Sequence, residues 1–77
     1  MPSLEQELRY ALEDAVIGKP IHRRMAADLG AVARAVLLRR GLSRWGVEVR
    51  QQGTGFWVRV TPPPGRPEVE QVVVRLG

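Results

Sequence analysis

The hydrophobic residues change their spacing once along this chain, at Gly41. Before Gly41 they recur every three or four residues, which is the period of one face of an α-helix. After Gly41 they alternate with polar residues, which is the period of a half-buried β-strand. Helices followed by strands predict the α+β class, in which the helices pack on one face of an antiparallel sheet.

Two helices are expected before Gly41, over residues 4–16 and 21–40. Ser3 and Gln6 have the spacing of a capping box at the start of the first helix. Gly18 and Pro20 predict a short joint between the helices and therefore an antiparallel helical hairpin. The first helix has an apolar face of Leu4, Leu8, Ala11, Leu12 and Ala15. The second has an apolar seam of Ile21, Met25, Leu29, Val32 and Val36.

Three strands are expected after Gly41, over residues 47–52, 55–61 and 69–76. The pair Gly53-Thr54 suits a type II′ turn, which predicts a hairpin between the first two strands. That register places Val49 opposite Val58, Glu48 opposite Arg59, and Arg50 opposite Trp57, so apolar residues meet and opposite charges meet. The expected architecture is a single domain, residues 1–77, of order α-α-β-β-β with a three-stranded antiparallel sheet.

The residue types present argue against an enzyme or a metal protein. The chain has 77 residues, no cysteine and one histidine, His22, so a thiolate site and a histidine cluster are both excluded. No Ser-His-Asp or Cys-His grouping is formed, and we expect no catalytic, cofactor-binding or metal-binding residue. A chain of this size buries only about 60% of its unfolded surface, which favours stabilisation by oligomerisation or by a protein partner.

The basic residues give one functional hypothesis, binding to nucleic acid. The formal net charge is +4, and eleven of the twelve basic residues are arginine, which suits phosphate as well as protein interfaces. A coding bias towards arginine explains the same composition without any ligand. The residues that would contact nucleic acid are Arg23, Arg24, Arg34, Arg39, Arg40, Arg50 and Arg59.

One arrangement for such binding is a helix-turn-helix followed by a wing. Residues 25–30 would form the first helix and turn, residues 31–42 the recognition helix, and residues 47–60 the wing. The stretch resembles winged-helix DNA-binding domains in its Ala-x-x-Leu-Gly turn, which ends at Gly30, and in its closing Arg-Gly-Leu. The competing interpretation is one uninterrupted helix, which we favour because the apolar seam passes Gly30 without a change of phase.

A second arrangement uses the sheet face that points away from the helices. Arg50, Trp57, Arg59 and Arg75 are expected there together with Glu48. A basic, aromatic surface can stack bases. In the competing interpretation, this is a solvated face on which Trp57 lies under arginine side chains.

Residues 42–77 resemble the C-terminal domain of contractile phage-tail sheath proteins and related small tail and baseplate components. The resemblance rests on the prolines of residues 62–64, followed by Pro67, Glu68 and an apolar strand. It implies a structural role in which strands are exchanged or added between subunits. The residues expected in the core or at such an interface are Trp45, Phe56, Trp57, Val72, Val74 and Leu76.

We therefore favour a small non-enzymatic assembly protein that associates through its sheet edge and helix seam, as part of a phage or phage-like particle. A homo-oligomer or another protein is the expected partner, and nucleic acid is the alternative. No run of residues approaches the ~20 apolar residues of a membrane span, so no membrane is expected. The expected location is the cytoplasm or a particle that is built inside the cell.

Overall fold

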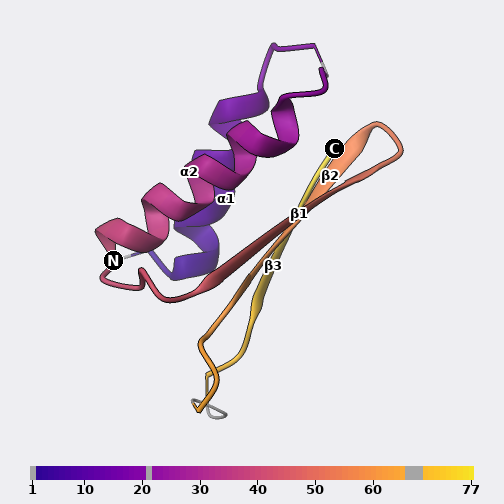
Figure 1. Ribbon diagram of the computed structural model, residues 1–77. Coiled ribbons are helices and arrows are strands. Elements are labelled where there is room, and N and C mark those ends of the chain that lie inside the picture. Colours follow the sequence, from indigo (N-terminus) through magenta and orange to yellow (C-terminus); the bar gives the residue numbers. More distant parts are fainter. Residues whose placement is uncertain (1, 21, 66–68) are drawn as a thin grey trace.

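The computed structural model describes residues 2–20, 22–65 and 69–77, and it confirms the predicted α+β architecture. Figure 1 shows two antiparallel helices that lie together on one side of a three-stranded antiparallel sheet. The elements are α1 (Leu4–Val16), α2 (Met25–Arg39), β1 (Gly46–Gln52), β2 (Gly55–Thr61) and β3 (Val72–Leu76). The strand order is β1-β2-β3, so β1 and β3 are the two edges.

Helix α1 begins at the predicted capping box. The Ser3 side chain accepts a hydrogen bond from the backbone N–H of Gln6 at 3.1 Å, and the Gln6 side chain accepts one from the backbone N–H of Ser3 at 3.0 Å. Two of the N–H groups that a helix start leaves unpaired are thereby satisfied. The bounds of α1 are those expected from the sequence.

Helix α2 begins at Met25 rather than at residue 21, so the predicted start is too early. His22 and Arg24 belong to a turn in which the His22 side chain accepts a hydrogen bond from the Arg24 backbone N–H at 3.2 Å. This local bond gives the backbone an alternative to the first helical turn. Ile21, which the predicted seam included, lies outside the described residues.

Helix α2 ends in a Schellman motif centred on Gly41, which has a φ of +73°. The N–H of Leu42 donates to the Leu37 carbonyl at 2.8 Å, and the N–H of Gly41 donates to the Leu38 carbonyl at 3.1 Å. Between these ends the helix runs through Gly30 without a break. The uninterrupted helix that we favoured at Gly30 is therefore confirmed, and the alternative, a helix-turn-helix over residues 25–42, is not formed.

The hairpin between β1 and β2 has the predicted register. Val49 pairs with Val58, and Arg50 pairs with Trp57. The two-residue loop has Gly53 at a φ of +60°, while Thr54 has no positive φ, as a type II′ turn requires. The turn chemistry and the cross-strand pairs therefore agree.

Strand β3 begins at Val72, three residues after the predicted start at residue 69. Its first pair is Val72 with Val60, so residues 69–71 would continue the ladder opposite residues 61–63. Pro62 and Pro63 have no backbone N–H to donate there, and the ladder stops. Val69 is left free to take part in another contact, described below.

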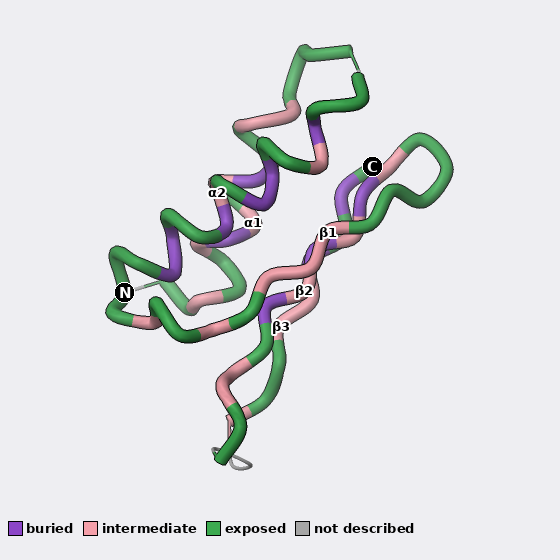
Figure 2. Tube along the Cα trace, in the orientation of Figure 1, coloured by how far each residue is buried: buried purple, intermediate pink, exposed green. Residues whose placement is uncertain are grey.

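The core lies between the helices and the inner face of the sheet, as Figure 2 shows by the buried positions along the trace. Helix α1 packs against α2 and β3, and α2 packs against β1 and β2. The described residues of the α2 seam lie in this core or pack against it, so the seam is not a surface for association. The buried apolar residues are Leu8, Leu12, Met25, Leu29, Ala33, Val36, Leu37, Phe56, Val58, Val60, Val74 and Leu76.

Candidate functional site

The outer face of the sheet is the first candidate surface. No described element covers it, and in Figure 1 both helices lie on the opposite side. Side chains alternate across a strand, so the register brings together one acid, three arginines, a valine and a tryptophan. This outer sheet face consists of Glu48, Arg50, Trp57, Arg59, Val73 and Arg75.

The centre of the outer sheet face is an arginine-tryptophan cluster. The guanidinium carbons of Arg50 and Arg59 lie 5.4 and 5.1 Å from the centroid of the Trp57 ring. Both arginines also pair with Glu48, Arg50 at 2.7 Å. Trp57 therefore lies under arginine side chains, as the solvated-face interpretation expects, and the face keeps a positive balance.

Glu48 is held ionised by its two arginine neighbours. Hydrogen bonding from Arg50, and then the charges of Arg50 and Arg59, lower the pKa of the Glu48 carboxyl. The Glu48 carboxylate forms ion pairs with two of the three arginines on this face. Arg75 forms no ion pair with any residue that the structure describes.

The free edge of β3 is the second candidate surface. β3 has a neighbouring strand on one side only, so its other side presents backbone groups to a further strand. Arg9 of α1 donates to one of the β3 carbonyls, that of Arg75, at 3.5 Å. Of the residues expected in the core or at an interface, Phe56, Val74 and Leu76 lie in the core and are 5%, 1% and 7% exposed. Val72 packs partly against the same core.

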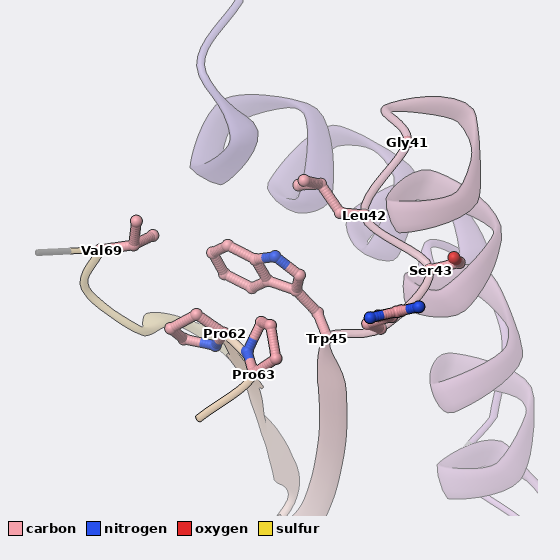
Figure 3. Close-up of a pocket in the computed structure, with 8 residues that line it drawn as sticks. Gly41, Leu42, Ser43, Trp45, Pro62, Pro63 and Val69 are labelled. Carbon is pink, nitrogen blue, oxygen red and sulfur yellow. The ribbon is translucent and has the colours of Figure 1, made fainter. Parts of the chain in front are cut away.

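Trp45 organises the third candidate surface. It follows the loop that closes α2, and its backbone N–H donates to the Leu42 carbonyl at 3.1 Å. Figure 3 shows the indole pointing from the start of β1 towards Val69, between Leu42 and the prolines Pro62 and Pro63. The side chain stays half-buried, with apolar neighbours on both sides.

Two hollows adjoin the indole. The larger has a volume of about 370 Å³ and is lined by Gly41, Leu42, Ser43, Arg44, Trp45, Pro62, Pro63 and Val69. The smaller has a volume of about 210 Å³ and is lined by Arg34, Leu37, Leu38, Ser43 and Trp45. We call these two hollows with the indole between them the Trp45 surface. Its walls are mainly apolar, Ser43 lines both hollows, and one arginine lies at each hollow.

The arginines of the helical layer have a different role. Arg39 of α2 and Arg40 at its C-cap pair with Glu7 of α1, at 3.2 and 2.7 Å. These bonds, that of Arg40 first, lower the pKa of the Glu7 carboxyl. Two of the residues predicted to contact nucleic acid therefore tie the helices to each other.

The seven predicted nucleic-acid residues do not form one surface. Arg50 and Arg59 lie on the outer sheet face, whereas Arg34, Arg39 and Arg40 belong to the helical layer on the other side of the sheet. Arg23 and Arg24 lie in the exposed turn before α2. The seven residues are therefore divided among three separate parts of the described structure.

The described residues form no cluster of three or more His, Asp or Glu side chains with the arrangement of a metal site. His22 is exposed, and its Nε2 lies 4.0 Å from a carboxylate oxygen of Asp28. Within the described ranges, neither α1 nor α2 is long and apolar enough to cross a bilayer.

Sequence reasoning named Trp45 but missed the surface around it. Val69 and Pro63 are distant from Trp45 along the chain, and no local pattern indicates that they meet. The exposed apolar residues Tyr10, Ile17 and Leu38 were also missed. Their signal is that all three are large apolar side chains outside the predicted seams.

We compared the chain with protein-family models, with curated proteins and with solved structures, and none of them matches. The resemblance of residues 42–77 to phage-tail components stays a prediction. Pro67 and Glu68, on which it rests in part, lie outside the described residues.

Proposed function

We propose that this chain is a small, non-enzymatic assembly protein that acts through protein-protein contacts at the free edge of β3. The observation that carries the proposal is the position of β3 as an edge strand, Val72–Leu76, with three consecutive valines. A narrower form makes the chain a component of a phage or phage-like particle built inside the cell. That form rests on the sequence resemblance alone.

An edge strand of this composition favours addition of a further strand. Backbone N–H and C=O groups along its outer side gain partners when a strand from another chain pairs there. Val73 lies half-buried on the outer sheet face and would become a cross-strand neighbour of the added strand. The helix seam takes no part, because its described residues lie in the core or pack against it.

The test is a charge at this edge. Val73→Lys places a lysine of the kind that natural edge strands use against strand addition. We expect its association, measured by sedimentation equilibrium, to weaken about tenfold, which corresponds to roughly 1.4 kcal/mol. Gln52→Lys is the matched control, because it adds the same charge to the other edge strand.

Hydrogen exchange then separates strand addition from other contacts. The β3 amides become more protected as protein concentration rises if a strand pairs there. An oligomer whose β3 amides exchange at an unchanged rate contradicts the proposal. So does a chain that stays monomeric into the millimolar range and for which its source yields no protein partner.

A second candidate function is binding of single-stranded nucleic acid on the outer sheet face. The observation that favours it is the arginine-tryptophan cluster on a sheet face that no described element covers. Arginine planes and an indole can stack bases while the positive balance attracts phosphate.

This second candidate predicts a salt-dependent change in Trp57 fluorescence when an oligonucleotide is added. The measurement uses Trp45→Phe as the parent, so that Trp57 is the remaining indole. Affinity falls steeply with added salt because bound counterions are released. Arg50→Gln weakens binding and Arg23→Gln, which is remote from this face, does not. An unchanged fluorescence at low salt rules this candidate out.

A further inference from the structure

The Trp45 surface has the features of a docking site for one protruding side chain. Its larger hollow, about 370 Å³, is at the low end of the roughly 300–1,000 Å³ of small-molecule pockets. Pro62 and Pro63 form a stiff wall, so the hollow does not have to be ordered on binding. Tryptophan and arginine are the residue types that dominate binding energy at protein interfaces.

The charge at the Trp45 surface favours an acidic partner. Arg34 lines the smaller hollow and Arg44 lines the larger one. Neither arginine forms an ion pair with any residue in the described ranges, whereas Arg39 and Arg40 both form ion pairs with Glu7. The exposed Leu38, 67% accessible, extends the apolar surface beside Arg34.

The chain itself presents a surface with the complementary features. Tyr10, Glu13 and Asp14 lie on the exposed side of α1, and Ile17 follows directly at the C-cap of the helix. Tyr10 and Ile17 are 66% and 73% exposed, and the two acids between them are exposed as well. We call these four residues the α1 outer stripe. It combines aromatic and aliphatic side chains with two negative charges.

One copy cannot bring its own two surfaces together. Helix α1 lies over β3 and α2, while the Trp45 surface lies at the start of β1. None of the four stripe residues lines either hollow of the Trp45 surface. The stripe of one copy is free to meet the surface of another.

We propose that the α1 outer stripe of one copy docks on the Trp45 surface of a second copy. Tyr10 enters the larger hollow beside the indole of Trp45, and Glu13 and Asp14 face the arginines of the second copy. Aromatic side chains add packing energy of about 0.5–1.5 kcal/mol beyond their buried area when they meet in this way. The charges fix the orientation and add attraction that salt screens.

The contact is heterologous, because two different surfaces meet. The pair then keeps one free surface of each kind, one on each copy, so assembly continues into a ring or a filament. This goes beyond strand addition at β3, which uses the backbone of the edge strand, although Glu13 and Ile17 of the stripe border the end of β3 at Leu76 and Gly77. The two contacts also respond differently to salt, because the stripe contact contains charges at its rim.

The experiment is a charge exchange read out by solution mass. One variant carries Glu13→Arg and Asp14→Arg, and the other carries Arg34→Glu and Arg44→Glu. Each variant alone places like charges at the contact, so we expect each to sediment as a smaller species than the unmodified chain. Mixed in equal amounts, the two variants present opposite charges at both contacts, and association returns.

Controls separate this contact from the fold and from the β3 edge. All exchanged residues are exposed, and circular dichroism checks that both variants keep the native secondary structure. In the unmodified background, Tyr10→Ala and Trp45→Phe each weaken association, whereas Tyr10→Phe retains most of it. Val73→Lys lowers the solution mass, but the association that remains keeps the salt dependence of the unmodified chain.

Association restored only in the mixture establishes the contact. The proposal is overturned if folded variants alone associate as the unmodified chain does, or if the mixture stays dissociated. It is also overturned if the unmodified chain is a monomer at millimolar concentration and low salt. Strand addition at β3 is tested separately by hydrogen exchange, so either proposal can fail alone.

Discussion

The two faces of this sheet are built from adjacent residues in the same strands, yet they are stabilised in different ways. On β2, Phe56 points into the core and Trp57 points out, and they are 5% exposed and half-buried respectively. The inner face gains its stability from apolar area removed from water. The outer face is held by arginine-tryptophan contacts and exposed ion pairs, which contribute little to folding. A chain of this size can therefore change its outer face with little risk to its fold.

The largest expected effect tests the inner face. Phe56→Ala removes a buried aromatic side chain and should cost about 3–5 kcal/mol in the free energy of unfolding. Small domains have roughly 0.05–0.15 kcal/mol of stability per residue, so this loss can unfold the chain. Urea unfolding followed by circular dichroism measures it.

Phe56→Leu is the control that keeps the measurement informative if the alanine variant does not fold. It retains most of the apolar volume and should cost less than the alanine variant. A cost for Phe56→Ala that is below about 1 kcal/mol would show that the inner face is not the main source of stability.

A second prediction concerns the backbone at one end of the pairing between β2 and β3. Gly55 approaches the last residues of β3 so closely that an added Cβ would lie 2.2 Å from the Leu76 carbonyl oxygen. Gly55→Ala therefore forces β2 and β3 apart and should cost about 1–3 kcal/mol. Gly46→Ala is matched to it, because an added Cβ at Gly46 meets no atom within 4 Å. Equal unfolding midpoints for the two variants would contradict the close approach.

A third prediction measures the outer face. A double-mutant cycle of Arg50→Met and Trp57→Leu should give a coupling energy of about 0.5–1 kcal/mol, the range of exposed cation-π pairs. Urea unfolding of the four proteins provides the numbers. A coupling above about 2 kcal/mol would mean that the outer face stabilises the fold as the inner face does.

The smallest effect is the acid dependence of the helix pair. Arg40 and Arg39 lower the pKa of Glu7, so the folded state holds the charged carboxylate more strongly than the unfolded chain does. The resulting stability is present above the ordinary pKa, near 4.5, and is lost as the pH falls through the folded pKa. The advantage of the unmodified chain over Glu7→Gln should therefore shrink below about pH 4.5.

Glu5→Gln, in the same helical turn, is the control for that measurement, because Glu5 forms no ion pair with the described residues. An advantage of the unmodified chain that does not change with pH would show that Glu7 acts through something other than its charge. Carbon-13 NMR titration of Glu7 gives the pKa itself.

The parts of the fold that local chemistry decides were predictable from the sequence. The capping box placed the start of α1, and the glycine-first turn with the opposed charges Glu48 and Arg59 placed the hairpin register. Two of the misses depend on partners distant in sequence, and a third is local. The start of β3 depends on which residues of β2 it faces, and the Trp45 surface depends on a loop that returns to the start of β1. The late start of α2 depends on a single side-chain hydrogen bond at His22.

The prolines after β2 also limit the register in which β3 can pair with β2. Only a slip by an even number of residues would keep Val72, Val74 and Leu76 on the inner face. A slip by two residues in one direction sets Val72 against Pro62, where a backbone donor is missing. A slip by two the other way carries Leu76 past the end of β2 into the hairpin turn. These two limits leave β3 a single register on β2, and that register fixes where Val74 and Leu76 meet the helices.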